Sequence, residues 1–190
     1  RFETKRLILE NCLFGVDKDF NAVEACKFGL LLKLLEDEDN SSIPLPALPD
    51  LSNNIHFGNS LVTRSDIEAG FQSEINPYDF RGVKFDVIIG NPPYMTTEHM
   101  GKLTPLELPV YKRRYATAFK QFDKYFLFIE RGLSLLKEQG YLGYIVPNKF
   151  TKIGAGEKLR RLLKDNGVFN KLFLLGQIKF FKIKQLTRVY

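Results

Sequence analysis

The chain has 190 residues, the length of one α/β domain and enough to bury a hydrophobic core, so we expect residues 1–190 to form a single domain. Its net charge of +6 is concentrated from Lys149 onward, which suits a polyanionic partner and fits equally well a solvated helix face with a frayed tail. A long apolar run, a signal-peptide pattern and a Cys/His cluster are all absent, which argues against a membrane partner and a metal site and predicts a cytoplasmic protein.

The first strand and helix are expected between residues 13 and 35. Leu13 to Asp17 is typical of a short strand, Asp19 occupies a helix N-cap position, and Ala22 to Leu35 is apolar enough to pack on a sheet. Asp17 then lies at the carboxyl end of a strand, where a carboxylate can accept two vicinal ribose hydroxyls. It could instead do no more than cap the helix.

A second short strand is expected at Asn54 to Gly58, immediately before Asn59. The preceding residues 36–54 are polar and contain three prolines, which is typical of a surface loop. Residues 65–83 lack a clear period, and we expect them to be irregular.

The central strand begins at Phe85, and its β-branched apolar run predicts a parallel strand buried on both faces. It ends in a rigid turn, Asn91-Pro92-Pro93-Tyr94. The Asn91 amide oxygen and the Pro92 carbonyl can each accept one N–H of a planar amine, Pro93 has no N–H to compete, and the Tyr94 ring can stack on a base. Ligands bind beyond the carboxyl ends of such strands, so the turn is the candidate catalytic site.

Basic and aromatic residues alternate after an expected irregular stretch, Met95 to Pro109. Lys112, Arg113 and Arg114 lie between Tyr111 and Tyr115, which suits contacts with nucleic-acid phosphates and also an ordinary helix face.

The remaining elements follow a helix–strand alternation. Apolar residues from Phe119 to Leu136 recur at helical spacing, and Tyr141 to Pro147 is a further strand with Phe150 close to its carboxyl end. A helix is expected at Glu157 to Lys164 and a strand at Phe169 to Leu175. Residues 187–190 resemble the opening of another strand, and the Gly154-Ala155-Gly156 run is too weak to predict a phosphate loop.

Asn-Pro-Pro-Tyr after a hydrophobic strand resembles the catalytic motif of S-adenosylmethionine-dependent adenine-N6 methyltransferases, especially the DNA methyltransferases of restriction-modification systems. The resemblance implies a Rossmann-like α/β sheet with flanking helices, and double-stranded DNA as substrate. It also implies that Asn91 to Tyr94 orient a flipped adenine toward the methyl donor, that Asp17 holds the cofactor ribose and that Asn59 contacts the cofactor adenine. Phe150 is the candidate for an aromatic wall of the site, and many family members carry Asp where this chain has Asn59.

The family's glycine-rich cofactor loop normally precedes the Asp17 strand, and the twelve residues before Leu13 contain no glycine. The resemblance therefore implies a partial methyltransferase domain, incomplete at its amino end and without a target-recognition domain. In the family's sheet the missing strand lies between the Asp17 and Asn91 strands. We expect unpaired sheet edges that could bind a partner chain or a second copy, and a fragment that is inactive by itself.

Two alternatives stay open at this point. The same turn could serve a methyltransferase that acts on a protein glutamine or on RNA, because it can hold any planar amine. The chain could also be a non-catalytic nucleic-acid-binding or assembly module.

Overall fold

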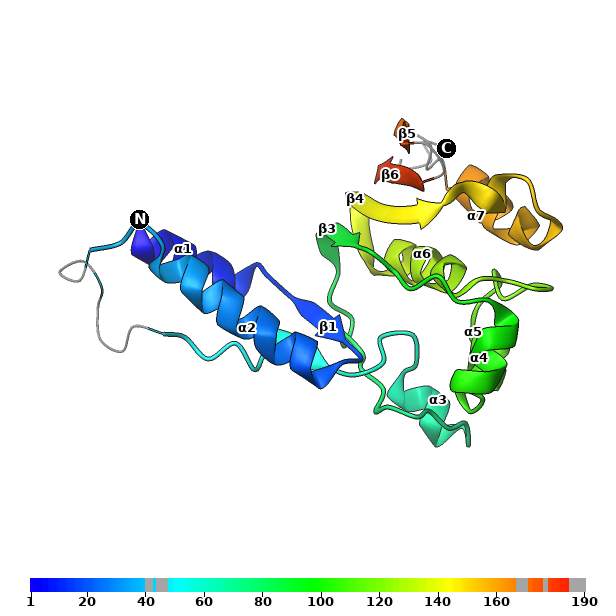
Figure 1. The fold of residues 1–190 in the computed structure, drawn as a ribbon, viewed down its shortest axis with the longest axis horizontal. Helices are drawn as coiled ribbons and strands as arrows, with labels where there is room; N and C mark the ends of the chain where they lie inside the picture. Colours follow the sequence, from blue (N-terminus) through cyan, green and yellow to red (C-terminus); the bar gives the residue numbers. More distant parts are fainter. Residues whose placement is uncertain (40–42, 44–47, 167–170, 176–177, 185–190) are drawn as a thin grey trace. The chain divides into compact units, whose positions relative to one another are not determined.

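The computed structural model describes residues 1–39, 43, 48–166, 171–175 and 178–184, with side chains up to residue 166 (Figure 1). The fold is α/β, as predicted. The chain divides into two compact units: unit 1 holds Arg1–Thr63 with Ile75–Tyr78, and unit 2 holds Arg64–Glu74 with the chain from Asp79 onward. Within the described ranges, no helix has the length and apolar character needed to cross a membrane. The single domain over residues 1–190 stays a prediction.

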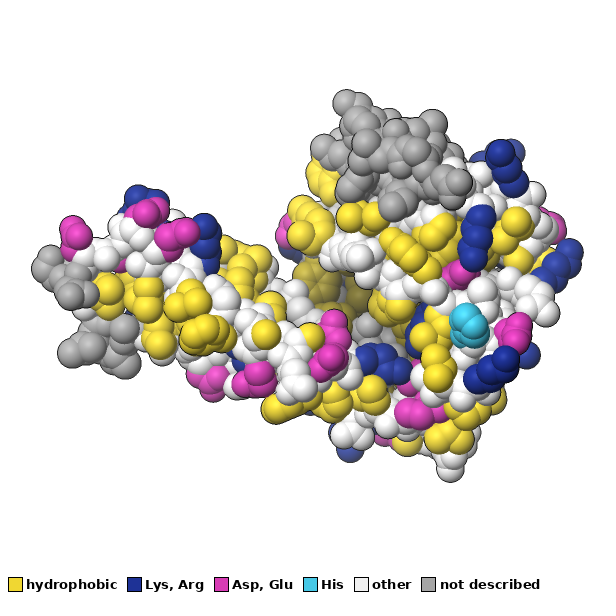
Figure 2. Space-filling model, viewed as in Figure 1, with side chains coloured by type: hydrophobic (Ala, Val, Ile, Leu, Met, Phe, Trp, Pro, Cys, Tyr) yellow, Lys and Arg dark blue, Asp and Glu magenta, His cyan; other side chains and the backbone are white. Residues whose placement is uncertain are grey.

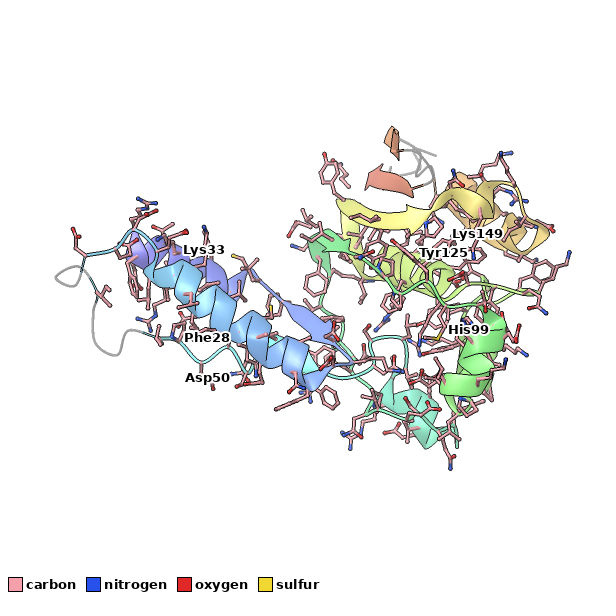
Figure 3. All side chains as sticks on the ribbon, viewed as in Figure 1. Phe28, Lys33, Asp50, His99, Tyr125 and Lys149 are labelled. Carbon is pink, nitrogen blue, oxygen red and sulfur yellow. The ribbon has the colours of Figure 1, made fainter. Side chains whose placement is uncertain are left out.

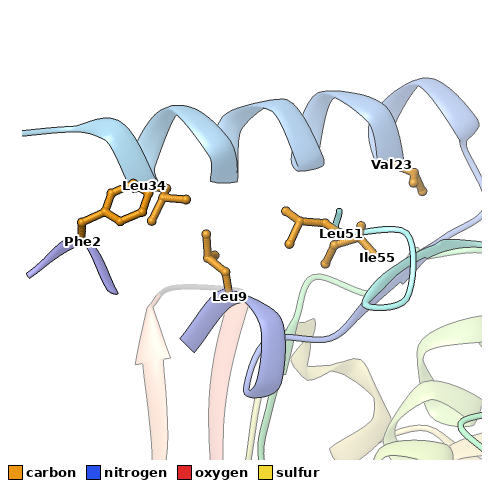
Figure 4. Close-up of a cluster of buried hydrophobic side chains, with 6 residues drawn as sticks. All are labelled: Phe2, Leu9, Val23, Leu34, Leu51 and Ile55. Atoms are coloured by element: carbon orange, nitrogen blue, oxygen red, sulfur yellow. The ribbon is translucent and has the colours of Figure 1, made fainter. Parts of the chain in front are cut away.

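Unit 1 packs two helices on a pair of short parallel strands. The order is α1 (Phe2–Asn11), β1 (Gly15–Asp17), α2 (Phe20–Leu35) and β2 (Ile55–Phe57), with Gly15 of β1 opposite Ile55 of β2. Figure 4 shows the core that fixes α1 against α2, which consists of Phe2, Leu9, Val23, Leu34, Leu51 and Ile55.

Local hydrogen bonds explain where the two helices of unit 1 end or begin. Asp19 caps α2, because its carboxylate accepts from the backbone N–H of Asn21 at 2.8 Å and of Ala22 at 3.3 Å. The buried Asn54 amide donates to the carbonyl oxygens of Glu10 and Leu13 at 2.9 and 3.0 Å, which satisfies acceptors at the end of α1.

The predicted strand, cap and helix of unit 1 are confirmed, although β1 is shorter than expected. The sequence interpretation missed α1. Phe2 and Leu9 lie seven residues apart, hence on one helix face, and the polar residues after Leu9 concealed that period. Part of the expected 36–54 loop lies outside the described residues.

Unit 2 contains a four-stranded sheet with the strand order β3-β4-β6-β5. β3 and β4 are parallel, whereas β6 runs antiparallel to both β4 and β5. In chain order, its elements are α3 (Arg64–Glu68), β3 (Phe85–Gly90), α4 (Thr97–Leu103), α5 (Glu107–Arg114), α6 (Lys124–Leu135), β4 (Leu136–Pro147), the 3₁₀ turns η1 (Asn148–Thr151) and η2 (Gly154–Gly156), α7 (Glu157–Asp165), β5 (Lys171–Leu175) and β6 (Ile178–Lys184).

Helix α6 covers one face of the β3–β4 pair. A Cβ on Gly132 of α6 would lie 2.9 Å from Leu142 Cδ1, so this glycine permits a close approach of helix and strand. Leu142 and Tyr144 of β4 are buried on that face.

The prediction that the central strand is buried on both faces is wrong. Among the described residues, β3 lies at the edge of its sheet and has β4 as its one strand partner. Val87 and Ile89 are 57% and 80% exposed. The apolar run predicted a strand, but burial depends on which elements cover its faces, and none of the described elements of unit 2 covers this face of β3. The expected sheet edge is present in the described part of the chain.

Several other boundaries differ from the sequence interpretation. The stretch expected to be irregular after Tyr94 contains α4 and the start of α5, and residues 65–83 contain most of α3. The helix expected from Phe119 begins only at Lys124, because Asp123 in an extended conformation occupies its N-cap position. α7 is confirmed, and β5 confirms the expected strand from Lys171 onward, since residues 169–170 lie outside the described chain. β6 was not predicted, and residues 187–190 also lie outside the described chain.

Candidate functional site

The turn Asn91 to Tyr94 follows the carboxyl end of β3, as predicted. Asn91 and Pro93 are exposed, Pro92 is buried, and the Tyr94 side chain is 46% exposed. Within the described part of the chain, no donor reaches the Pro92 carbonyl oxygen. The turn therefore combines a backbone carbonyl that no described donor engages with an exposed amide and an exposed aromatic ring.

Tyr94 closes this turn through its hydroxyl group. The hydroxyl oxygen lies 2.8 Å from Asn91 Oδ1 and 2.8 Å from the carbonyl oxygen of Ile145 in β4. Burial raises the pKa of the Tyr94 phenol above its ordinary value, so the hydroxyl keeps its proton at neutral pH. One proton cannot be donated fully to two acceptors, so the two contacts share it or alternate. Asn91 Oδ1 has two lone pairs and can accept a further N–H from a ligand.

Asp123 fixes the chain immediately after Tyr94. Its side chain is 97% buried, Oδ1 accepts from the backbone N–H of Met95 at 2.9 Å, and Oδ2 lies 2.6 Å from Nζ of Lys149. The N–H of Thr97 and its hydroxyl both donate to the carbonyl oxygen of Phe122, at 3.1 and 2.7 Å. The segment after Tyr94 is therefore tied to the start of α6, and through Lys149 to the end of β4.

The ring of Tyr94 packs against a second tyrosine, Tyr125 of α6, which Figure 3 labels together with Lys149. The two ring centroids are 6.1 Å apart in an edge-to-face arrangement, and the Tyr125 hydroxyl donates to the carbonyl oxygen of Pro147 at 3.2 Å. Burial raises the pKa of Tyr125 far above its ordinary value. The Tyr125 ring therefore packs against Tyr94, while its neutral hydroxyl group donates to Pro147.

Phe150 is fully buried in η1, and its carbonyl oxygen accepts from Arg160 Nη1 at 2.6 Å. The Phe150 ring is therefore part of the core of unit 2. Its expected role as a wall of the base or cofactor site stays a prediction.

The basic segment Lys112–Arg114 forms the end of α5, and its three side chains make different contacts. Arg114 forms an ion pair of 2.8 Å with the buried carboxylate of Asp66, and the Arg113 guanidinium lies 4.8 Å from the centroid of the Phe71 ring. Lys112 is exposed and forms no ion pair with any described residue. Arg114 and Arg113 therefore stabilise α5 against α3 and the loop after it. Their phosphate contacts, like that of Lys112, stay predictions.

The two candidate cofactor residues belong to unit 1. Asp17 is exposed at the carboxyl end of β1, and its Oδ1 accepts from the backbone N–H of Asp19 at 2.8 Å. No described residue binds its other oxygen, so the carboxylate fits a diol without giving up an existing contact. Asn59 is 1% exposed, and its Oδ1 already accepts from the N–H of Leu61 at 3.1 Å. It fits a cofactor contact less well.

Sequence reasoning missed Asp123 and Tyr125 as parts of this site. Their only local signal is the Phe-Asp-Lys-Tyr start of a helix, in which Asp123 has the form of an ordinary N-cap. The hydrogen bond from Met95 and the contact with Tyr94 arise from tertiary packing.

Residues 11–181 match the family described as Eco57I restriction-modification methylase. The type II restriction enzyme and methyltransferase RM.Eco57I of Escherichia coli is 55% identical over 187 residues, which cover 97% of this chain and 19% of that enzyme. The type II methyltransferase M.BstVI of Geobacillus stearothermophilus is 35% identical over 162 residues, which cover 83% of this chain and 25% of that protein. This chain thus spans about a fifth to a quarter of these two curated relatives.

Among solved structures, a candidate class I S-adenosylmethionine-dependent methyltransferase from Listeria monocytogenes superposes with a TM-score of 0.46 at 13% identity. The superposition covers 97% of this chain and 58% of that protein. The fold class rests on the family match and on the helices and parallel strand pairs described above.

Proposed function

Because this chain belongs to the Eco57I restriction-modification methylase family, we propose that the full-length protein methylates N6 of adenine at specific sites in double-stranded DNA. S-adenosylmethionine is the cofactor that family membership implies. The observation that carries the proposal is the turn after β3, where the Asn91 amide and the unengaged Pro92 carbonyl oxygen stand beside the exposed ring of Tyr94. These groups match a planar base that bears an exocyclic amine.

In this proposal the target adenine leaves the duplex and enters the turn, since N6 cannot be reached inside the base stack. The Asn91 amide oxygen and the Pro92 carbonyl oxygen each accept one N–H of the amine. Two acceptors placed out of the ring plane favour a more tetrahedral nitrogen, whose lone pair can then point at an electrophile. The turn acts by positioning and electrostatics, so no strong base is needed.

Tyr94 supplies the stacking face in this proposal, and its hydroxyl holds the ring in place. The contacts with Asn91 and Ile145 fix the ring at one end, and the edge of Tyr125 supports it. An aromatic ring fixed in this way loses little conformational entropy when a base stacks on it. Phe150 is kept as a further candidate for the wall of the site.

The proposed cofactor contacts are those of Asp17 and Asn59. S-adenosylmethionine, when bound, supplies an electrophilic methyl group. The unpaired carboxylate oxygen of Asp17 supports a contact with the ribose hydroxyls, whereas the engaged amide of Asn59 would offer only its remaining hydrogen-bonding capacity to the adenine ring. The 190 residues contain no glycine-rich loop ahead of Asp17, so we propose that this piece alone does not transfer methyl groups.

Partners and location follow from the proposed substrate. Among the described strands, β3 has a neighbour on one side only, and this edge position supports pairing with further chain or with a second copy. If the substrate is cellular duplex DNA, the protein works in the compartment that holds it, which for a restriction-modification system is the cytoplasm.

The test replaces Asn91 by Ala in the full-length protein and measures transfer of a labelled methyl group to duplex DNA, with identification of the methylated nucleoside. We expect loss of N6-methyladenine formation by at least two orders of magnitude, with the thermal unfolding midpoint unchanged because Asn91 is exposed. Robust methylation by this variant would contradict the role of the turn. Methylation of another base by the unaltered protein would contradict the adenine assignment.

The same assay separates the alternative functions. Duplex DNA, RNA and a glutamine-bearing protein substrate are offered in parallel to the full-length protein. Transfer to RNA or protein alone would favour the alternative methyltransferases. Salt-sensitive DNA binding without any transfer would favour a non-catalytic binding module.

A further inference from the structure

Two lysine side chains converge on the ring of Phe119, in the loop between α5 and α6. Nζ of Lys120 lies 4.9 Å from the ring centroid, and Nζ of Lys158, from the first turn of α7, lies 5.5 Å from the same centroid. The two ammonium groups are 38 residues apart in the chain. One aromatic ring thus brings together two cations from separate elements.

In the described part of the chain, neither of these cations is paired with a carboxylate. Lys120 and Lys158 form no ion pair there, and neither does the exposed Lys152 between η1 and η2. By contrast, other cations of unit 2 have acidic partners, among them Lys149, Arg114 and Arg161. Figure 2 shows Lys and Arg side chains gathered over the edge of unit 2 that carries α7. Two unpaired like charges at one ring repel each other unless an anion lies between them.

The backbone at Lys120 has a strained conformation. Lys120 adopts a positive φ of 55°, a left-handed conformation that non-glycine residues rarely take. A Cβ on Gly154 of η2 would lie 3.8 Å from Lys120 Nζ, so the lysine extends to the η2 turn, close to where α7 begins. Strained backbone of this kind persists where surrounding contacts enforce it and is frequent at binding sites.

The position of the pair links it to the catalytic turn. Lys120 precedes Asp123 by three residues, and Asp123 binds both the N–H of Met95, next to Tyr94, and the side chain of Lys149. Lys120 is therefore close in sequence to the residue that fixes the segment after Tyr94.

We infer that Lys120 and Lys158, held around the Phe119 ring, bind the phosphate backbone of the DNA strand next to the target base. The inference depends on the proposed DNA substrate and assigns a phosphate-binding site outside the α5 segment. Two lysines at one aromatic ring neutralise phosphates without reading sequence. The contact therefore increases the affinity for DNA and fixes the position of the strand. Other parts of the protein recognise the bases.

The experiment measures binding of the full-length protein to a fluorescent 30-base-pair duplex by anisotropy between 50 and 300 mM salt. The variant is K120Q/K158Q. Its control is K102Q/K164Q, which removes the same charge from an exposed, ion-paired lysine of α4 and from an exposed lysine near the end of α7. A second variant, K120R/K158R, keeps both charges and both cation–π contacts.

We expect K120Q/K158Q to weaken binding on the order of ten-fold at 100 mM salt and to lower the salt slope, log K against log salt, by about 2 in magnitude. The control and the Arg variant should keep the original slope within about 0.5. An equal loss in the control would overturn the inference, since the effect would then be one of net charge. An unchanged slope in K120Q/K158Q would overturn it directly.

A parallel titration with a single-stranded RNA of equal charge decides the class of polyanion. A slope change with RNA and none with DNA would also overturn the inference. Methyl transfer is measured separately on the same preparations. Absent transfer with the expected slope change would count against the proposed reaction alone, and normal transfer with no slope change would count against the phosphate site alone.

Discussion

Asp123 Oδ1 accepts a hydrogen bond from the backbone N–H of Met95 at 2.9 Å, although the two residues are 28 positions apart. Its Oδ2 binds Lys149 at 2.6 Å. One buried carboxylate therefore joins three segments: the end of the Asn91–Tyr94 turn, the start of α6 and the residues after β4. Each of these segments carries a residue of the candidate site, so the carboxylate sets their relative position.

Replacing Asp123 by Ala should destabilise unit 2 by about 2–3 kcal/mol, because the Met95 N–H loses a charged acceptor and Lys149 loses its partner. Replacing it by Asn should cost less, since the amide oxygen can still accept from Met95. Urea unfolding followed by circular dichroism measures both. Equal losses in the two variants would show that the Met95 bond is not the stabilising contact.

Glu107 and Lys124 form a buried ion pair whose side chains are 0% and 3% exposed. Glu107 Oε2 lies 3.5 Å from Lys124 Nζ and accepts from the Tyr111 hydroxyl at 2.6 Å. Replacing Glu107 by Gln should cost about 3–5 kcal/mol, because the buried Lys124 ammonium loses the carboxylate that lies 3.5 Å from it.

The double variant E107L/K124M is the control for that prediction, since it removes both charges and keeps the volume. We expect it to recover most of the lost stability in the same urea titration. A double variant as unstable as E107Q would mean that the hydrogen bonds of Glu107, and not its charge, stabilise α5 against α6.

Gly156 permits a close backbone approach at the start of α7. A Cβ at this position would lie 2.0 Å from the carbonyl oxygen of Phe150, far below van der Waals contact. Gly156→Ala should therefore cost about 3 kcal/mol or more and lower the thermal unfolding midpoint. Gly101→Ala in α4, where nothing lies within 4 Å of the added Cβ, should be neutral or stabilising by up to about 1 kcal/mol. Similar effects in both variants would contradict the steric explanation.

Tyr115 should make the folded state sensitive to alkaline pH. Burial raises its pKa from 10.0 to about 12, so the folded protein keeps a proton that the unfolded chain loses above pH 10. The contribution of Tyr115 is therefore complete below pH 10 and is lost as the pH rises from 10 to about 12, at roughly 1.4 kcal/mol per pH unit.

The measurement is the free energy of unfolding at pH 8, 9, 10 and 11, for the native chain and for Tyr115→Phe. The variant should lose less stability between pH 10 and 11, because one raised tyrosine pKa is gone. Parallel pH profiles for the two proteins would show that Tyr115 ionises normally or that other groups control the alkaline response.

The local features of this protein could be predicted from the amino-acid sequence alone. A β-branched run followed by Asn-Pro-Pro-Tyr predicted the strand, the turn and the methyltransferase resemblance, and the family match confirms that resemblance. Asp19 predicted the start of α2 because an N-cap acts within three residues. Such signals can be recognised in a short stretch of sequence because they arise from backbone geometry and short-range hydrogen bonds.

How these features are used depends on tertiary packing. The ion pair of Arg114 with Asp66, 48 residues away, has no signal in the local sequence, and the phosphate contact of Arg114 stays a prediction. The exposure of Ile89 depends on which elements cover that face of β3, and the convergence of Lys120 and Lys158 on Phe119 depends on the packing of α7 beside the α5–α6 loop. Burial and charge pairing are set by neighbours distant in sequence, and no local pattern encodes them.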